Sequence, residues 1–111
     1  EKALLSRLSA ALSPLGAEVT DPGLVPPHCV PEDDPFVQTL LGVYRDYTGQ
    51  SARCLAIGGG TYVHDIPGGV AFGCAMPGVD NRMHEPDEFA ILDDLVLSAK
   101  MFAQVILDVC G

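Results

Sequence analysis

The amino-acid sequence indicates a mixed fold of helices and strands, of the α/β type, or α+β if the 111 residues form a unit of their own. Two kinds of pattern support this prediction. Near both ends of the chain, apolar residues recur at spacings of three and four, which is typical of amphipathic helices. Between them lie two short, continuous apolar runs beside glycines, which is typical of buried strands.

The first predicted helix covers residues 2–13, where Leu4, Leu8 and Leu12 form an apolar stripe. We expect it to end near Pro14, because proline interrupts helical hydrogen bonding. The stripe needs an apolar partner. The candidates are a domain outside these residues and a second copy of the chain.

After this helix, residues 17–25 suggest a short strand broken by a turn sequence, Asp-Pro-Gly. A second helix should then begin at Asp34, whose carboxylate can cap it, with Pro35 at the first helical position. Gly49 should end it as a left-handed cap. The apolar residues of this segment define its predicted buried face: Phe36, Val37, Leu40, Leu41, Tyr44 and Tyr47.

Two strands and a last helix are predicted from residue 53 onward. The strands are the apolar runs 54–57, which stops at three glycines, and 69–75. The helix contains apolar residues at alternating spacings of four and three: Leu95, Ala99, Phe102, Ile106 and Val109. This stripe predicts a helix that packs against a core.

Composition limits the classes of function. The net charge is −9, with no cluster of Lys or Arg, so nucleic acid and anionic membrane surfaces are not expected partners. No apolar run reaches the roughly 20 residues that span a bilayer. The chain starts at Glu1, with no Met and no visible helix cap, which predicts a piece of a longer protein.

The four cysteines contain no C-x-x-C pair: Cys29, Cys54, Cys74 and Cys110. Since each lies in or near an apolar stretch, we expect reduced core thiols and a cytoplasmic protein, with one disulfide as the alternative.

A glycine-rich turn is one candidate binding element. Its backbone N–H groups could approach an anion, because no side chain intervenes, and the threonine adds a hydroxyl. The alternative is a tight turn that needs glycine only for its backbone angles. The surroundings match neither a phosphate-binding loop nor a dinucleotide fingerprint. The residues are Gly58, Gly59, Gly60 and Thr61.

His84 is the candidate metal ligand, because imidazole binds zinc well and a loop between Pro77 and Pro86 restricts its position. The alternative is a solvated loop histidine. The H-E-x-x-H motif of another metallopeptidase class fails here, since the last position is Glu88. Two other histidines, His28 and His64, carry no metal motif, and we expect His64 to lie at the surface.

An ordered set of motifs links these features. Residues 58–62 read GGGTY, 70–73 VAFG, 77–78 PG, and 93–95 DDL, with His84 and Glu88 between the last two. The set resembles the C-terminal part of zinc-dependent dipeptidases of the PepV-like branch of the aminoacylase/carboxypeptidase metallopeptidase family. The likeness extends weakly upstream and covers nearly the whole chain.

This resemblance implies hydrolysis of dipeptides by a zinc-activated water at a two-zinc site. His84 would be a terminal zinc ligand, Glu88 an acceptor for its ring, and residues 58–61 the contact for the substrate's C-terminal carboxylate. It also implies that 1–52 end a lid domain and 53–111 end the catalytic domain. The other zinc ligands, the catalytic glutamate and the carboxylate-binding arginine would lie upstream.

The resemblance therefore implies partners as well: a dipeptide substrate and the remainder of the same enzyme chain. The 111 residues by themselves should neither bind zinc tightly nor hydrolyse dipeptides, because one histidine cannot fill a tetrahedral site. The rival hypothesis is a non-catalytic α+β module for interaction or homo-oligomerisation, which would use the leucine stripe and the acidic surface.

Overall fold

The computed structural model describes residues 2–20, 23, 25–73 and 75–111. Three α-helices follow one another: α1 (Lys2–Leu12), α2 (Pro35–Thr48) and α3 (Leu92–Cys110). Short 3-10 helices, η1 (Ser13–Leu15) and η2 (Tyr62–Asp65), lie between them. The described residues contain no strand, so the predicted α/β fold is wrong, and so is its α+β form.

The physical reason is the lack of a pairing partner. The predicted strand at 54–57 is neither helix nor strand. Among the described residues, no neighbouring backbone pairs with it through a ladder of hydrogen bonds. Leu55 and Ile57 are 68% and 66% exposed. The predicted strand at 69–75 also lacks strand structure over its described residues, 69–73 and 75. The same holds for the described residues of the short strand predicted at 17–25, which are 17–20, 23 and 25. Positions 21–22, 24 and 74 of these predictions lie outside the described residues.

The three predicted helices are confirmed, but the predicted core stripe of the last one is wrong, because all five of its residues are exposed and α3 buries Ser98 and Met101 instead. The side chain of Asp34 accepts hydrogen bonds from Phe36 N and Val37 N, at 2.9 and 3.4 Å, and Pro35 starts α2. Gly49 ends α2 with φ 68°, in the left-handed region that glycine tolerates. The first helix ends one residue before the predicted bound.

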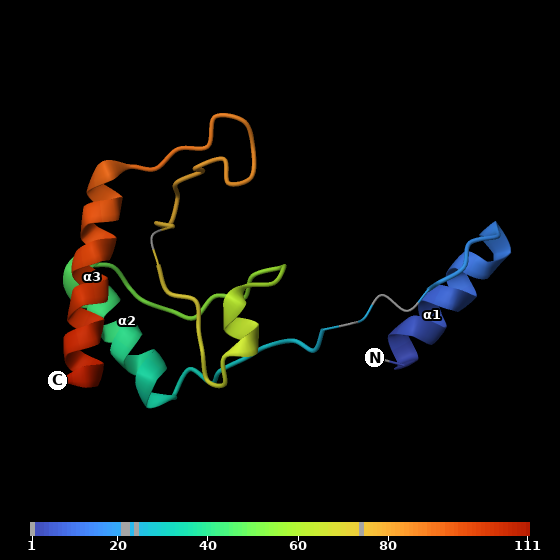
Figure 1. Ribbon diagram of the computed structural model, residues 1–111, viewed down its shortest axis with the longest axis horizontal. Coiled ribbons are helices and arrows are strands. Elements are labelled where there is room, and N and C mark those ends of the chain that lie inside the picture. Colours follow the sequence, from blue (N-terminus) through green and yellow to red (C-terminus); the bar gives the residue numbers. More distant parts are fainter. Residues whose placement is uncertain (1, 21–22, 24, 74) are drawn as a thin grey trace.

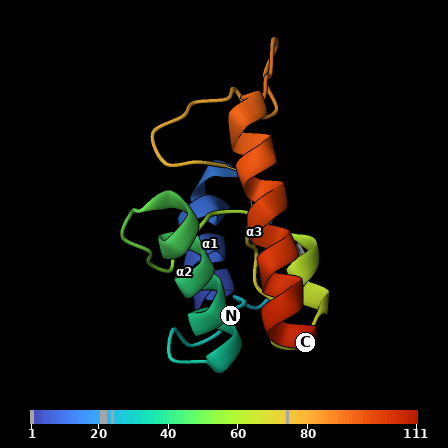
Figure 2. The same ribbon diagram turned by 90° about the vertical axis from the view of Figure 1, so that its left-hand side faces the viewer.

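The helices α2 and α3 pack side by side and form the core (Figures 1 and 2). The buried apolar side chains of the described residues are Val37, Leu40, Val43 and Met101. Two of them, Val37 and Leu40, belong to the predicted face of α2. Phe36 and Tyr47 of that face are each 38% exposed.

The first helix, α1, stands apart from this pair at the far end of an extended connection (Figure 1). None of its described residues is buried. The radius of gyration is 18.9 Å, whereas a compact domain of this length has about 13 Å. The leucine stripe therefore has no partner within the described part of the chain.

The cysteines also differ from the prediction. Cys29, Cys54 and Cys110 are free thiols, as predicted, but they are exposed and lie outside the core. Cys74 lies outside the described residues. No helix in the described ranges is long and apolar enough to cross a membrane.

Candidate functional site

The glycine turn projects from the segment that joins α2 to η2. All three glycines are exposed, and a side-chain carbon added to any of them would meet no atom within 4 Å. Crowding therefore does not explain the glycines. Only Gly59, with φ 95°, needs glycine for its backbone angle. The turn is an open backbone surface that a ligand or another part of a protein can reach.

Thr61 closes this turn and caps η2: its side chain faces the backbone N–H of His64, and the His64 side chain faces the backbone N–H of Thr61. The Thr61 Oγ1 is buried, and its contact with His64 N–H falls short of a full hydrogen bond. The threonine backbone is fixed, because His64 N–H donates to Thr61 O at 3.2 Å.

His64 holds the turn in a way that the sequence does not reveal. Its Nδ1 lies 3.2 Å from Thr61 N, as acceptor, and 3.0 Å from Thr61 O. The side chain is half-buried, so the expectation of a surface histidine was only partly right. The ring closes the first turn of η2 onto the residue that follows the glycines.

His28 reaches the same region from the connection between α1 and α2. Its Nε2 lies 2.6 Å from Gly69 O, and its ring centroid lies 5.4 Å from that of His64. An added side-chain carbon at Gly69 would lie 2.9 Å from Ile66 Cβ, so glycine is needed there. The two histidines and Asp65 line an open hollow with residues 29–31 and 66–68. Nothing local in the sequence signals this contact, because 41 positions separate His28 from Gly69.

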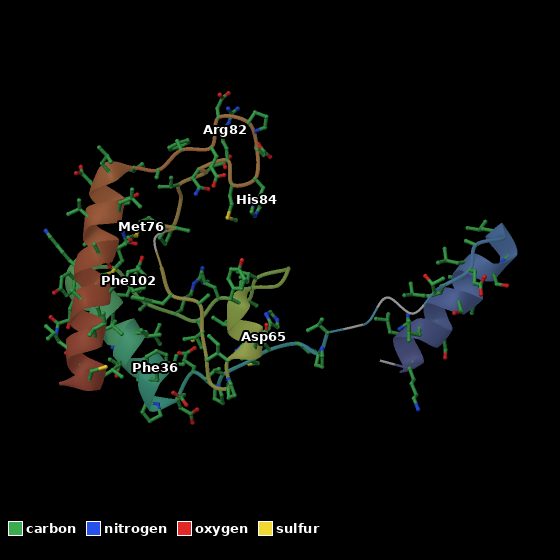
Figure 3. All side chains as sticks on the ribbon, in the orientation of Figure 1. Phe36, Asp65, Met76, Arg82, His84 and Phe102 are labelled. Carbon is green, nitrogen blue, oxygen red and sulfur yellow. The ribbon has the colours of Figure 1, made fainter. Side chains whose placement is uncertain are left out.

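His84 lies on a separate loop, residues 81–89, which stands away from the helices α2 and α3 (Figure 3). We call this segment the outer loop. Its side chain is exposed, and its φ of 66° falls in the left-handed region. Arg82 and Asp87 share this property, with φ 57° and 62°. Non-glycine residues rarely adopt such angles, and clusters of them occur preferentially at functional sites.

Hydrogen bonds inside the outer loop maintain this conformation. Phe89 N–H donates to Asn81 O at 3.2 Å, and Glu85 N–H donates to Arg82 O at 2.8 Å. The carboxylate of Glu88 accepts from the backbone N–H of His84 at 3.4 Å. The predicted pair, His84 and Glu88, is thus in contact, but through the main chain of His84 instead of its ring.

The described residues do not form a complete metal site. No group of three or more His, Cys, Asp or Glu side chains that could hold a metal occurs in the part of the chain that the structure describes. Zinc requires four ligands, usually three or four of them from protein. The described residues therefore do not bring together the ligands that a zinc ion needs.

The glycine turn and the outer loop belong to one long connection between α2 and α3, but none of the hydrogen bonds of the described residues joins them. Both lie on the same side of the helices α2 and α3, to the right of them in Figure 1. The structure thus presents two separate open elements.

Cys54 lies near the start of this connection. Partial loss of hydration raises the pKa of its thiol, and the nearby carboxylate of Glu32 raises it further. The thiolate is therefore less populated than in an isolated cysteine, which disfavours a nucleophilic role.

Comparison with known proteins identifies relatives of this chain. It is 42% identical over 107 residues to the Beta-Ala-Xaa dipeptidase of Lactobacillus delbrueckii subsp. lactis, which covers 96% of the chain. Two further relatives are named "Putative dipeptidase". One is YtjP of Bacillus subtilis, 43% identical over 74% of the chain, and the other, from Staphylococcus aureus strain USA300, is 34% identical over 99%.

The chain spans about a fifth of the length of these relatives: 22%, 18% and 23%. No family model and no solved structure matches it. The predicted resemblance to a dipeptidase is confirmed, since the identity extends along almost the whole chain. By its sequence, the chain therefore belongs to the dipeptidase family, as the counterpart of one region of these longer proteins.

Proposed function

We propose that the chain is part of a metallodipeptidase, which hydrolyses the peptide bond of dipeptides. One observation carries this proposal: the 42% identity, along 96% of the chain, to a protein named Beta-Ala-Xaa dipeptidase. Because the chain spans only 22% of that relative, the activity is that of a longer protein. A cytoplasmic location belongs to the same proposal.

Within this enzyme, His84 would be the one zinc ligand that the chain contributes. An exposed ring, on a loop with unusual backbone angles, is available to a metal whose other ligands lie outside these residues. Bound zinc supplies a water that is nucleophilic at neutral pH. The chain would hold the His84 ring in place for the metal, because the hydrogen bond from His84 N–H to the Glu88 carboxylate restrains the backbone that carries the ring.

The glycine turn would bind the C-terminal carboxylate of the substrate. Open backbone around Gly59 suits an anion, because side-chain carbons added to the three glycines would meet no atom within 4 Å. Thr61 follows these glycines, and its capping of η2 fixes the end of the turn. We assign Gly58, Gly59, Gly60 and Thr61 to this contact.

The division into a lid domain, 1–52, and a catalytic domain, 53–111, is also part of the proposal. The helices α2 and α3 pack together across this boundary. The two parts would thus share an interface in the longer enzyme.

The test compares His84→Ala with Glu85→Gln in the longer natural protein. Glu85 is a fair control because it is exposed, lies in the same loop and has no assigned role. We expect His84→Ala to lose bound zinc and to reduce hydrolysis of a β-alanyl dipeptide by more than the roughly 100-fold that outer-shell changes reach. Metal content measured by mass spectrometry and steady-state kinetics give the two readouts. Unchanged zinc and kinetics would refute the role of His84.

A second candidate is a non-catalytic association module. The observation that favours it is the uncovered stripe on α1, where Leu4 and Leu8 are 50% and 41% exposed. Lack of dipeptide hydrolysis by the longer wild-type protein, in the presence of zinc, would favour this alternative.

A further inference from the structure

The apolar surface of the helix α3 is only partly covered by the other described residues. Ser98 and Met101, on the inner face, are 3% and 1% exposed where they pack against α2. The sequence-predicted core stripe begins beside this inner face, because Val109 follows Ser98 by about 20° around the helix, and its Phe102 packs edge-on against Phe72, with ring centroids 5.7 Å apart. Leu95, Ile106 and Val109 of that stripe are 42%, 61% and 53% exposed.

We define the outer face of α3 by six exposed apolar residues: Leu92, Leu95, Val96, Ile106, Leu107 and Val109. At 3.6 residues per turn, they fall in an arc of about 160°, in which every residue is apolar. The polar residues Lys100, Gln104 and Asp108 lie to one side of it. Figure 2 shows α3 along the outside of the molecule. An apolar arc this wide, which extends well beyond the residues that are buried, is typical of a helix that is covered on more than one side.

We propose that the outer face of α3 is the contact surface for the part of the longer protein that lies outside these 111 residues. The relatives are four to five times as long as the chain, which covers 22% and 18% of two of them, so such a part is available. The surface of that part which contacts the outer face of α3 must also be apolar. This proposal goes beyond the catalytic function and does not depend on it.

The exposed area of the whole molecule is large enough for an extensive partner. The accessible surface is 8797 Å², whereas a compact protein of 11.7 kDa has about 5,900 Å². The excess of about 2,900 Å², which includes α1 and the extended connections as well as the outer face of α3, is more than three times the roughly 800 Å² that one partner buries in a standard interface. Charge favours the remainder of the longer protein over a second copy, because a second copy would bring another net charge of −9.

Cysteine scanning in the longer natural protein tests the proposal. Ile106→Cys places a thiol on the outer face, and Lys100→Cys is the matched control on the polar side of the same helix. We expect N-ethylmaleimide to modify Cys at position 106 at least about tenfold more slowly than in urea, and Cys at position 100 at nearly the rate found in urea. Peptide mass spectrometry separates these positions from the native cysteines.

Two results would overturn the proposal. Equal, fast modification at both positions would mean that the outer face is exposed to solvent. Protection at position 106 that disappears on dilution, together with a halved mass in sedimentation, would assign the face to a second copy. Because neither readout uses hydrolysis, failure here is distinguishable from failure of the dipeptidase proposal.

Discussion

The hydroxyl of Ser98 is buried on the inner face of α3 and has no hydrogen-bond partner among the described residues. A buried unpaired hydroxyl destabilises a protein by about 1–3 kcal/mol relative to a satisfied one. Ser98→Ala should therefore stabilise the protein by about 1 kcal/mol. It should raise the melting temperature of the longer protein by about 2 °C.

A control is needed because alanine also favours helices over serine. Ser9→Ala supplies it, since Ser9 is helical and exposed. The difference between the two shifts in melting temperature reports burial. An equal shift would mean that Ser98 has a partner, such as a water.

The thiol of Cys54 gives a prediction about pH. Since hydration loss and the Glu32 carboxylate raise its pKa, its alkylation rate should keep rising at pH values where an ordinary cysteine has levelled off. Glu32→Gln should shift the profile of Cys54 to lower pH and increase its rate at pH 8 by less than about tenfold. Glu18→Gln, which alters an exposed carboxylate, should change nothing.

Single residues also show where prediction from the sequence stops. The spacing of His84 and Glu88 is local, and the structure does bring the two residues into contact, although through the His84 backbone. The contact of His28 with Gly69 and His64 could not be predicted, because nothing near His28 in the sequence indicates which distant segment it meets.

The cap of α2 is the clearest local feature at the level of the helices. Asp34 accepts two backbone hydrogen bonds at the helix N-terminus, whereas its neighbour Asp33 is exposed and outside the helix. Asp34→Ala should therefore destabilise α2 by about 1 kcal/mol, and Asp33→Ala by much less. Hydrogen exchange of the first amides of α2, measured in both variants, checks this. Equal exchange rates would contradict the role of the cap.

All three helices could be predicted because their signals are local: apolar spacing, Asp34 and Pro35 at one end of α2, Gly49 at the other. The predicted strands failed because a strand depends on hydrogen bonds to a distant backbone. A short apolar run such as 54–57 indicates a segment that favours burial, but it does not indicate which secondary structure or which neighbouring segment will bury it.

For the whole molecule, the absence of a complete ligand set predicts weak metal binding. The isolated 111-residue chain should bind zinc no more tightly than other exposed single histidines do, and should not hydrolyse dipeptides, because three ligands are not brought together in its described part. Isothermal titration with zinc, compared with His84→Ala, measures this. Tight binding at one zinc per chain would contradict the prediction.

The overall architecture was the least predictable property. The sequence indicates helices with apolar faces but not their partners, so the predicted stripes of α1 and α3 are expected to pack, although the structure leaves both largely exposed. Whether an apolar stripe is buried depends on the segment that packs against it, and the spacing of residues within one helix does not identify that segment.

The contact between α2 and α3 has a consequence for the order of folding. It closes a connection of about forty residues, 49–91, which costs about 1.3 kcal/mol more in chain entropy than a ten-residue loop. Such distant contacts form slowly. The glycine turn and the outer loop both lie inside this connection. The two candidate elements should therefore acquire their final positions together, late in folding, when the two helices meet.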